Sequence, residues 1–126
     1  MFLLISPLVI IKSNGKSWSI NLNHYRNTYY RTLNNLKISY KEEMTLQIKK
    51  LPLLTKIKII YTLYPATRRL CDVANVCSIT DKFFCDSLVE LEIIKDDNYL
   101  YIPEVNYVFG NVDKLNPRVE ILIIQI

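Results

Sequence analysis

Glycine and histidine are scarce in this sequence: among its 126 residues there are two glycines, and His24 is the single histidine. A chain with so little glycine, half of whose residues are hydrophobic, does not have the composition of a flexible linker or a disordered tail. Its length suits one domain with one core and leaves no room for a second. We therefore expect a single domain over residues 1–126.

The cysteines exclude an ordinary zinc site. Cys71, Cys77 and Cys85 are odd in number and form no C-x-x-C pair, and one histidine cannot complete a zinc site of usual spacing. We expect all three thiols to be reduced and packed within the fold. Reduced cysteines are typical of the cytoplasm, where we expect this protein to act.

No apolar run is long enough for a membrane span. Residues 1–11 are apolar, but they lack the basic leader and small-residue cleavage site of a signal peptide. A membrane helix would need about 20 such residues. A buried β-strand is the better interpretation, and it also applies to Val119–Ile126, where β-branched residues dominate. We expect no membrane association.

Acidic residues are nearly missing from the first half of the chain. Residues 1–71 hold twelve Lys and Arg against two Glu, a charge of +10, while residues 72–126 hold four Lys and Arg against ten acids, a charge of −6. A metal-dependent nuclease requires a basic surface around an acidic pocket, because cations hold phosphates and carboxylates hold the metal. Folding can equally mix the two halves in space, and the charge count alone leaves both possibilities open.

Local patterns predict an α+β fold. In the first third of the chain we expect a strand over residues 2–11, an Asn14-Gly15 turn, a returning strand over Ser17–Leu22 and an exposed loop over residues 23–31. A helix over residues 37–50 then ends before Pro52, with Ile38, Met44 and Ile48 on its apolar face, and a strand follows over Ile57–Tyr64.

The second half is expected to add one helix and two strands. Asn75 can cap a helix that runs to about Glu92, with Ile79, Phe83 and Ser87 on its buried face, and strands follow over residues 99–109 and 119–126. The predicted architecture is a small α+β sandwich, in which two main helices pack on a mixed β-sheet.

Acidic residues flank this second helix. Asp72 precedes it, Asp96 and Asp97 follow it, and Lys82, Asp86 and Glu90 form one stripe along it because they are spaced four residues apart. If the chain curls back across the helix, Asp72, Asp97 and Asp86 would form a carboxylate cluster suited to Mg²⁺, with Lys82 beside the scissile phosphate. The alternative is that these acids are helix caps and solvated turns, and that Lys82 with Asp86 is a surface pair of little energetic value.

The same segment resembles the RusA family of Holliday-junction resolvases. The resemblance lies in three runs: Arg68-Arg69-Leu70-Cys71-Asp72-Val73-Ala74-Asn75, Asp81-Lys82-Phe83-Phe84-Cys85-Asp86-Ser87-Leu88, and Ile94-Lys95-Asp96-Asp97. In that family a basic stretch leads into D-x-D-N, a helix carries K-x-x-x-D-x-L, and an Asp-Asp pair follows. Upstream, residues 22–27 resemble the Asn- and Arg-containing N-terminal loop of phage-borne members.

The resemblance implies a homodimeric, Mg²⁺-dependent endodeoxyribonuclease of DNA recombination and repair. Such an enzyme resolves four-way DNA junctions by paired nicks, and Mn²⁺ is expected to substitute for Mg²⁺. It would act in the cytoplasm of a bacterial or phage-infected cell, without an organic cofactor.

Motif positions carry the expected roles to particular residues. By the resemblance, Asp72, Lys82 and Asp97 are catalytic, and the metal ligands are drawn from Asp72, Asp86, Asp96 and Asp97. Arg68 and Arg69 match the basic run that would contact phosphates. Arg26, Arg31 and Lys37 join them as expected DNA contacts of the basic half.

This sequence departs from the family pattern in two places. Ala74 stands where the second aspartate of D-x-D-N belongs, and four extra residues separate Asn75 from Lys82. Four residues are close to one helical turn, so the helix can begin a turn earlier with its faces aligned. Asp86 is the better replacement for the missing carboxylate, and Asp81 the weaker one. If neither replaces it, the chain would bind junctions without cutting them.

The predicted loop over residues 23–31 alternates aromatic and basic side chains. Tyr25, Tyr29 and Tyr30 lie among Arg26 and Arg31. This mixture suits contact with phosphates and unstacked bases at a junction centre, but the tyrosines can equally fold over the core. A structural protein without a nucleic-acid role is the third hypothesis, and the motif spacing disfavours it.

Overall fold

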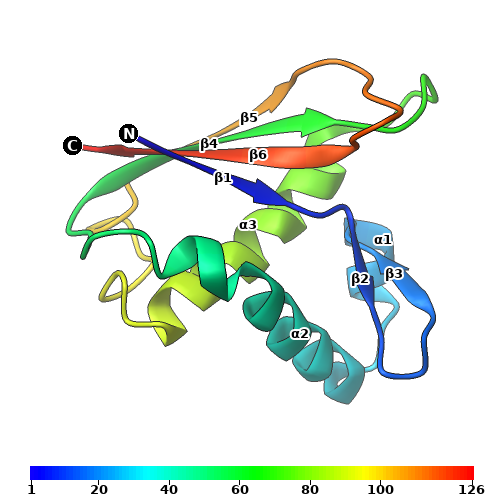
Figure 1. The fold of residues 1–126 in the computed structure, drawn as a ribbon, viewed down its shortest axis with the longest axis horizontal. Helices are drawn as coiled ribbons and strands as arrows, with labels where there is room; N and C mark the ends of the chain where they lie inside the picture. Colours follow the sequence, from blue (N-terminus) through cyan, green and yellow to red (C-terminus); the bar gives the residue numbers. More distant parts are fainter.

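A four-stranded mixed sheet and two long helices packed on one of its faces make up most of this computed structural model, which describes all of residues 1–126 (Figure 1). The strands lie in the order β1-β6-β4-β5; β4 and β5 are parallel and the other pairs are antiparallel. Their bounds are β1 (Phe2–Ser6), β4 (Ile57–Tyr64), β5 (Glu104–Phe109) and β6 (Arg118–Gln125). The α+β class predicted from the sequence is confirmed.

The two central strands alternate between the two faces of the sheet. In β4 every second residue is buried against the helices, and β6 does the same through Val119, Ile121 and Ile123. Successive strand side chains point to opposite faces, so one face supplies half of the core. The opposite face carries no helix and stays partly exposed.

Helix α2 (Tyr30–Ile48) begins seven residues before the predicted Lys37. Its buried side chains recur every four residues: Leu36, Tyr40, Met44 and Ile48. The predicted apolar face included Ile38, which is wrong, because 51% of Ile38 is exposed. The end of the helix before Pro52 is confirmed.

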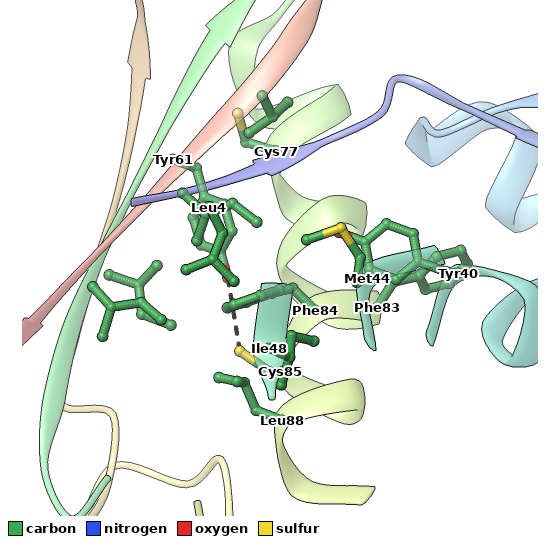
Figure 2. Packing of buried hydrophobic residues seen from close by; sticks show 14 of the residues in the cluster. Leu4, Tyr40, Met44, Ile48, Tyr61, Cys77, Phe83, Phe84, Cys85 and Leu88 are labelled. Atoms are coloured by element: carbon green, nitrogen blue, oxygen red, sulfur yellow. Dashed lines mark hydrogen bonds between the residues drawn. The ribbon is translucent and has the colours of Figure 1, made fainter. Parts of the chain in front are cut away.

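Helix α3 (Val73–Glu90) has Asp72 as its N-cap residue, three residues ahead of the predicted Asn75 cap. It contacts α2 on one side and β4 and β5 on another. Phe83 therefore packs on Tyr40 of α2, while Phe84 packs edge-on against Tyr61 of β4 (Figure 2). The predicted burial of Ile79, Phe83 and Ser87 is confirmed. Because α2 covers one side of α3 and the sheet covers another, further residues of this helix are buried.

The predicted first strand is two strands in separate sheets. The chain leaves the main sheet at Pro7, and β2 (Val9–Ile11) pairs with β3 (Ser17–Ser19) in a small hairpin. Proline has no backbone N–H to donate to a sheet, so the ladder ends there. The Asn14-Gly15 turn is confirmed, and Gly15 has the positive φ of +82° that glycine tolerates best.

Residues 23–31 are not a loop, contrary to the prediction. Residues Leu22–Arg26 form a short helix, α1, whose N-cap residue Asn21 accepts a hydrogen bond at Oδ1 from the backbone N–H of His24, 2.8 Å away. Asn21, the residue that caps α1, lies just before the polar stretch. A helix of five residues is too short to show a repeating apolar pattern in the sequence. Similarly, the strand predicted over residues 99–109 covers only Glu104–Phe109, because Asn98 to Tyr101 form a turn.

The outer edge of β1 is closed by one side chain of α2. Gln47 accepts a hydrogen bond from the backbone N–H of Ile5, at 2.7 Å, and donates one to the carbonyl oxygen of Ile5, at 2.8 Å. The amide of Gln47 thus satisfies both backbone groups that a further strand would use at this residue.

A carboxylate lies between α3 and the sheet. Asp81 accepts hydrogen bonds from the Tyr61 hydroxyl at 2.6 Å, the Tyr107 hydroxyl at 3.2 Å and the Cys85 thiol at 3.1 Å. Burial, followed by the nearby charge of Asp81, raises the pKa of both the Tyr107 hydroxyl and the Cys85 thiol. This cluster is the main polar connection between α3 and the strands β4 and β5.

We expect Tyr61→Phe to destabilise the fold by about 1–2 kcal/mol, because it leaves Asp81 short of its shortest hydrogen bond. Urea unfolding followed by circular dichroism measures this change. Tyr64→Phe, a matched loss of a hydroxyl on the same strand, is the control. Equal stability of Tyr61→Phe and the wild type would contradict a stabilising role for the bond.

Candidate active site

The acids expected to form one site lie at opposite ends of α3. Asp72 is the exposed residue before the first turn, and its side chain makes no capping hydrogen bond. Asp86 lies in the fourth turn, and a separation of 14 residues corresponds to about 21 Å of helix. Asp97 lies beyond the far end, where its pKa responds to Asp86. The chain does not return across α3, so the condition under which Asp72 and Asp97 would join in one cluster is not met.

Three acids gather near the C-terminal end of α3. Asp96 accepts hydrogen bonds from the backbone N–H of Asp97, at 2.7 Å, and from the side chain of Asn98, at 3.0 Å. The pKa of Asp97 is raised by partial desolvation, by a side-chain hydrogen bond with Asp96 and by the charge of Asp86. Asp97 therefore carries an unfavourable charge that a bound cation would relieve.

Lys82, Asp86 and Glu90, which form one stripe along α3, make contacts that differ from those expected. The ammonium group of Lys82 lies over the ring of Tyr25, 5.8 Å from its centre, and it is not beside Asp72. Asp86 lies 3.6 Å from Lys37, and Glu90 lies 2.8 Å from Lys41. No ion pair joins Lys82 to Asp86. The two acids of the stripe instead connect α3 to α2.

One chain does not assemble the predicted metal centre. No group of three or more His, Cys, Asp or Glu side chains is placed to hold a metal ion. The predicted set of Asp72, Asp86, Asp96 and Asp97 fails because Asp72 is at the other end of the helix. The residues of a single chain therefore do not fit Mg²⁺ as a shared ligand set.

Neither candidate for the carboxylate missing at Ala74 is well placed. Ala74 is exposed in the first turn of α3, near Asp72. Asp81 is already held by two tyrosines and a thiol, and Asp86 is one helix turn further on beside Lys37. Neither acid reaches the Asp72 end of the helix.

Four arginines are free of ion pairs. Arg26, Arg31, Arg68 and Arg69 are all exposed and belong to none of the five ion pairs, whereas Lys37 pairs with Asp86. Three of those pairs join a cation of residues 1–71 to an acid of residues 72–126, so folding mixes the two charge halves in part. The arginines keep their charge available for an anionic partner.

The aromatic residues of the N-terminal segment divide between two roles. Tyr25 packs against Phe83, with ring centres 6.3 Å apart, and so covers the core. Tyr29 and Tyr30 are about 60% exposed and contact each other with tilted rings, 4.8 Å between ring centres, and Arg31 lies over the ring of Tyr30. Of these three tyrosines, only Tyr29 and Tyr30 offer aromatic surface to a ligand.

A groove of mixed polar and apolar lining lies beside Asp72, between α1 and the loop over residues 65–71. It has a volume of about 500 Å³, and its walls include Asn23 and His24 of α1, Arg69 of the loop and Asn75 of α3. Asn75 connects α3 to α1 by accepting a hydrogen bond from the backbone N–H of Leu22 at 3.2 Å. The sequence predicts Asn75 as a helix cap and as part of the D-x-D-N-like run and gives His24 no role, because their proximity depends on the unpredicted helix α1.

Comparisons with known proteins do not identify this chain. No family model matches its sequence, and no match is found among curated proteins. No helix is long and apolar enough to cross a membrane.

We expect Asp97→Asn to raise the free energy of unfolding slightly, by less than about 1 kcal/mol because Asp97 is exposed to solvent. The pKa of Asp97 is raised in the folded state, so its ionisation costs stability as the pH rises above its unfolded value. The gain should therefore be present at pH 7 and vanish near pH 3. Chemical unfolding at both pH values in EDTA tests this, and a variant less stable than wild type at pH 7 would contradict it.

Proposed function

We propose that this protein is a metal-dependent endodeoxyribonuclease that nicks branched DNA, such as four-way junctions, as a homodimer in the cytoplasm of a bacterial or phage-infected cell. The observation that carries the proposal is the proximity of Asp97 to Asp96 and Asp86 near the C-terminal end of α3, where partial desolvation, a side-chain hydrogen bond with Asp96 and the charge of Asp86 raise the pKa of Asp97. Carboxylates held together at such a cost are typical of sites that bind a divalent cation. The resemblance of residues 68–97 to the RusA motifs supports the same chemistry.

The chain's own residues would bind and orient the DNA. Arg68 and Arg69, in the exposed loop before α3, are free to contact backbone phosphates. Asp72 and Asp97 offer carboxylate oxygens, and Lys82 offers a positive charge near the middle of α3. When bound, Mg²⁺ or Mn²⁺ supplies Lewis-acid polarisation of the phosphate and lowers the pKa of a coordinated water.

Two copies of the chain would bring the separated acids together. α3 is an 18-residue helix with Asp72 at its start and Asp97 beyond its end. In a dimer with two-fold symmetry, antiparallel α3 helices place the Asp72 end of one copy beside the Asp97 end of the other. Each dimer would then have two equivalent sites, as paired nicks on symmetric strands require.

We expect Asp72→Asn and Asp97→Asn each to abolish nicking of a labelled four-way junction in Mg²⁺, while mixing the two inactive proteins restores it. In a mixed dimer the intact Asp72 of one copy meets the intact Asp97 of the other. If half of the dimers are mixed and each has one working site, about a quarter of the wild-type activity should return, mostly as single nicks.

Matched controls define the alternatives. Glu42→Gln removes an exposed carboxylate of α2 that forms no ion pair and should leave nicking unchanged, and a linear duplex controls for junction specificity. Two inactive variants without rescue on mixing would contradict a site shared between two copies. If the wild type did not nick junctions, or nicked them equally well in EDTA, the proposal of a metal-dependent nuclease would be rejected.

Ala74 favours a second candidate, a junction-binding protein without catalysis. The first turn of α3 has only one carboxylate, Asp72, where the RusA motif has two, and neither Asp81 nor Asp86 reaches this end. On this hypothesis the wild type binds junctions in EDTA and Mg²⁺ alike, and Ala74→Asp introduces metal-dependent nicking. Strong nicking by the wild type, unchanged in Ala74→Asp, would exclude this candidate.

A further inference from the structure

The groove between α1 and the loop over residues 65–71 combines apolar residues with the hydrogen-bond donors and the cation of an anion site. Its lining includes no Asp or Glu, and Arg69 projects from one wall without an ion-pair partner. Asn23 lies on the wall of α1. Asn75 uses Oδ1 to accept from Leu22, which leaves its Nδ2 group to donate to a ligand. A phosphate oxygen suits a site with donors, one permanent cation and no acid.

The imidazole of His24 has a fixed orientation in this groove. Its Nδ1 atom lies 3.0 Å from the carbonyl oxygen of Ser19 and 3.5 Å from the side-chain nitrogen of Asn21. A carbonyl oxygen only accepts, so the closer contact requires Nδ1 to carry the proton and donate. Nε2 then remains free. It is an acceptor while the ring is neutral, and it becomes a donor with a positive charge when the ring is protonated.

The neighbouring charges decide how protonation changes the groove. Arg69 and Cys71 line the loop wall, and Asp72 follows them in sequence. Arg26 is the other cation of α1, and α3 contributes only the uncharged Asn75 and Val76 to the lining. Protonation of His24 therefore gives the groove a second cation opposite Arg69, with no acid in the lining to neutralise it. Affinity for a phosphate rises with that charge.

We propose that this groove binds one backbone phosphate of the DNA strand that passes Asp72, between His24 and Arg69, and that protonation of His24 tightens the contact. The inference rests on the proposed function for the identity of the strand as DNA. It adds a pH-dependent positioning contact, with His24 and Asn75 as residues outside the RusA-like acids. His24 is the chain's single histidine, so its titration can be observed without assignment.

The test is an NMR titration of the His24 imidazole in the wild-type protein, between pH 5 and 8, in EDTA and low salt. It is run alone and with a saturating single-stranded 12-nucleotide DNA. Binding that prefers the protonated ring must raise the titration midpoint by linkage. We expect a rise of about 0.5–1 pH unit, equivalent to about a three- to tenfold higher affinity for the protonated form.

Three variants separate a groove contact from a general effect of nearby DNA. Arg69→Gln removes the opposite wall's cation and should reduce the rise in midpoint, while Lys49→Gln, at the far end of α2, should leave it unchanged. His24→Gln keeps a donor for Ser19 and should lose the gain in DNA affinity, measured by fluorescence anisotropy, between pH 7.5 and pH 5.5. An unmoved midpoint, or an equal gain in His24→Gln, overturns the proposal.

The outcome is independent of catalysis because the measurement contains no metal. A protein that nicks junctions but shows no change in midpoint keeps the proposed function and loses the groove. A protein whose midpoint rises but that never nicks keeps the groove and loses the nuclease.

Discussion

The burial of α3 between the sheet and α2 is the constraint on which the rest of the structure depends. Phe83 packs against α2 and the small hairpin, where Trp18 stacks on it at 5.9 Å, while Phe84 packs against β4. Aromatic side chains buried on two sides fix both the rotation and the axial position of a helix. That position keeps Asp72 and Asp97 apart, and it points Asp81 towards the tyrosines of β4 and β5.

The fold could be predicted where one face of an element is buried. β4 and β6 alternate cleanly, and α3 carries enough large apolar residues to be recognised. The prediction failed where local hydrogen bonds decide the conformation. Asn21 caps α1 without any apolar period, and Pro7 divides an apolar run that looks continuous in sequence. Such choices depend on single contacts, and a pattern averaged over several residues does not detect them.

The candidate site divides in the same way. The sequence located the acids around α3 correctly, because their positions at the ends of a helix follow from its length. It could not supply their distances, since the direction of the chain after Ile94 depends on tertiary packing. The groove at His24 was missed because it requires α1 to lie against the first turn of α3, a contact made by Leu22 and Asn75, 53 residues apart in sequence.

The basic residues in the first half of the chain include some that form ion pairs within the fold and others that form none. Lys37, Lys41 and Lys58 connect elements of the fold through acids from the other half of the chain. The arginines at positions 26, 31, 68 and 69 have no such role. Arginine keeps its charge at any physiological pH and binds phosphate in a bidentate manner, so these positions have more value for an external partner than for stability.

The bond between Gln47 and Ile5 limits how the sheet can grow. With the β1 edge occupied by an amide side chain at this residue, β5 has the open edge of the main sheet. A strand added at the β1 edge would have to displace Gln47 from Ile5, whereas a strand added at β5 would displace no such contact. Strand pairing between copies is therefore favoured at the β5 edge over the β1 edge.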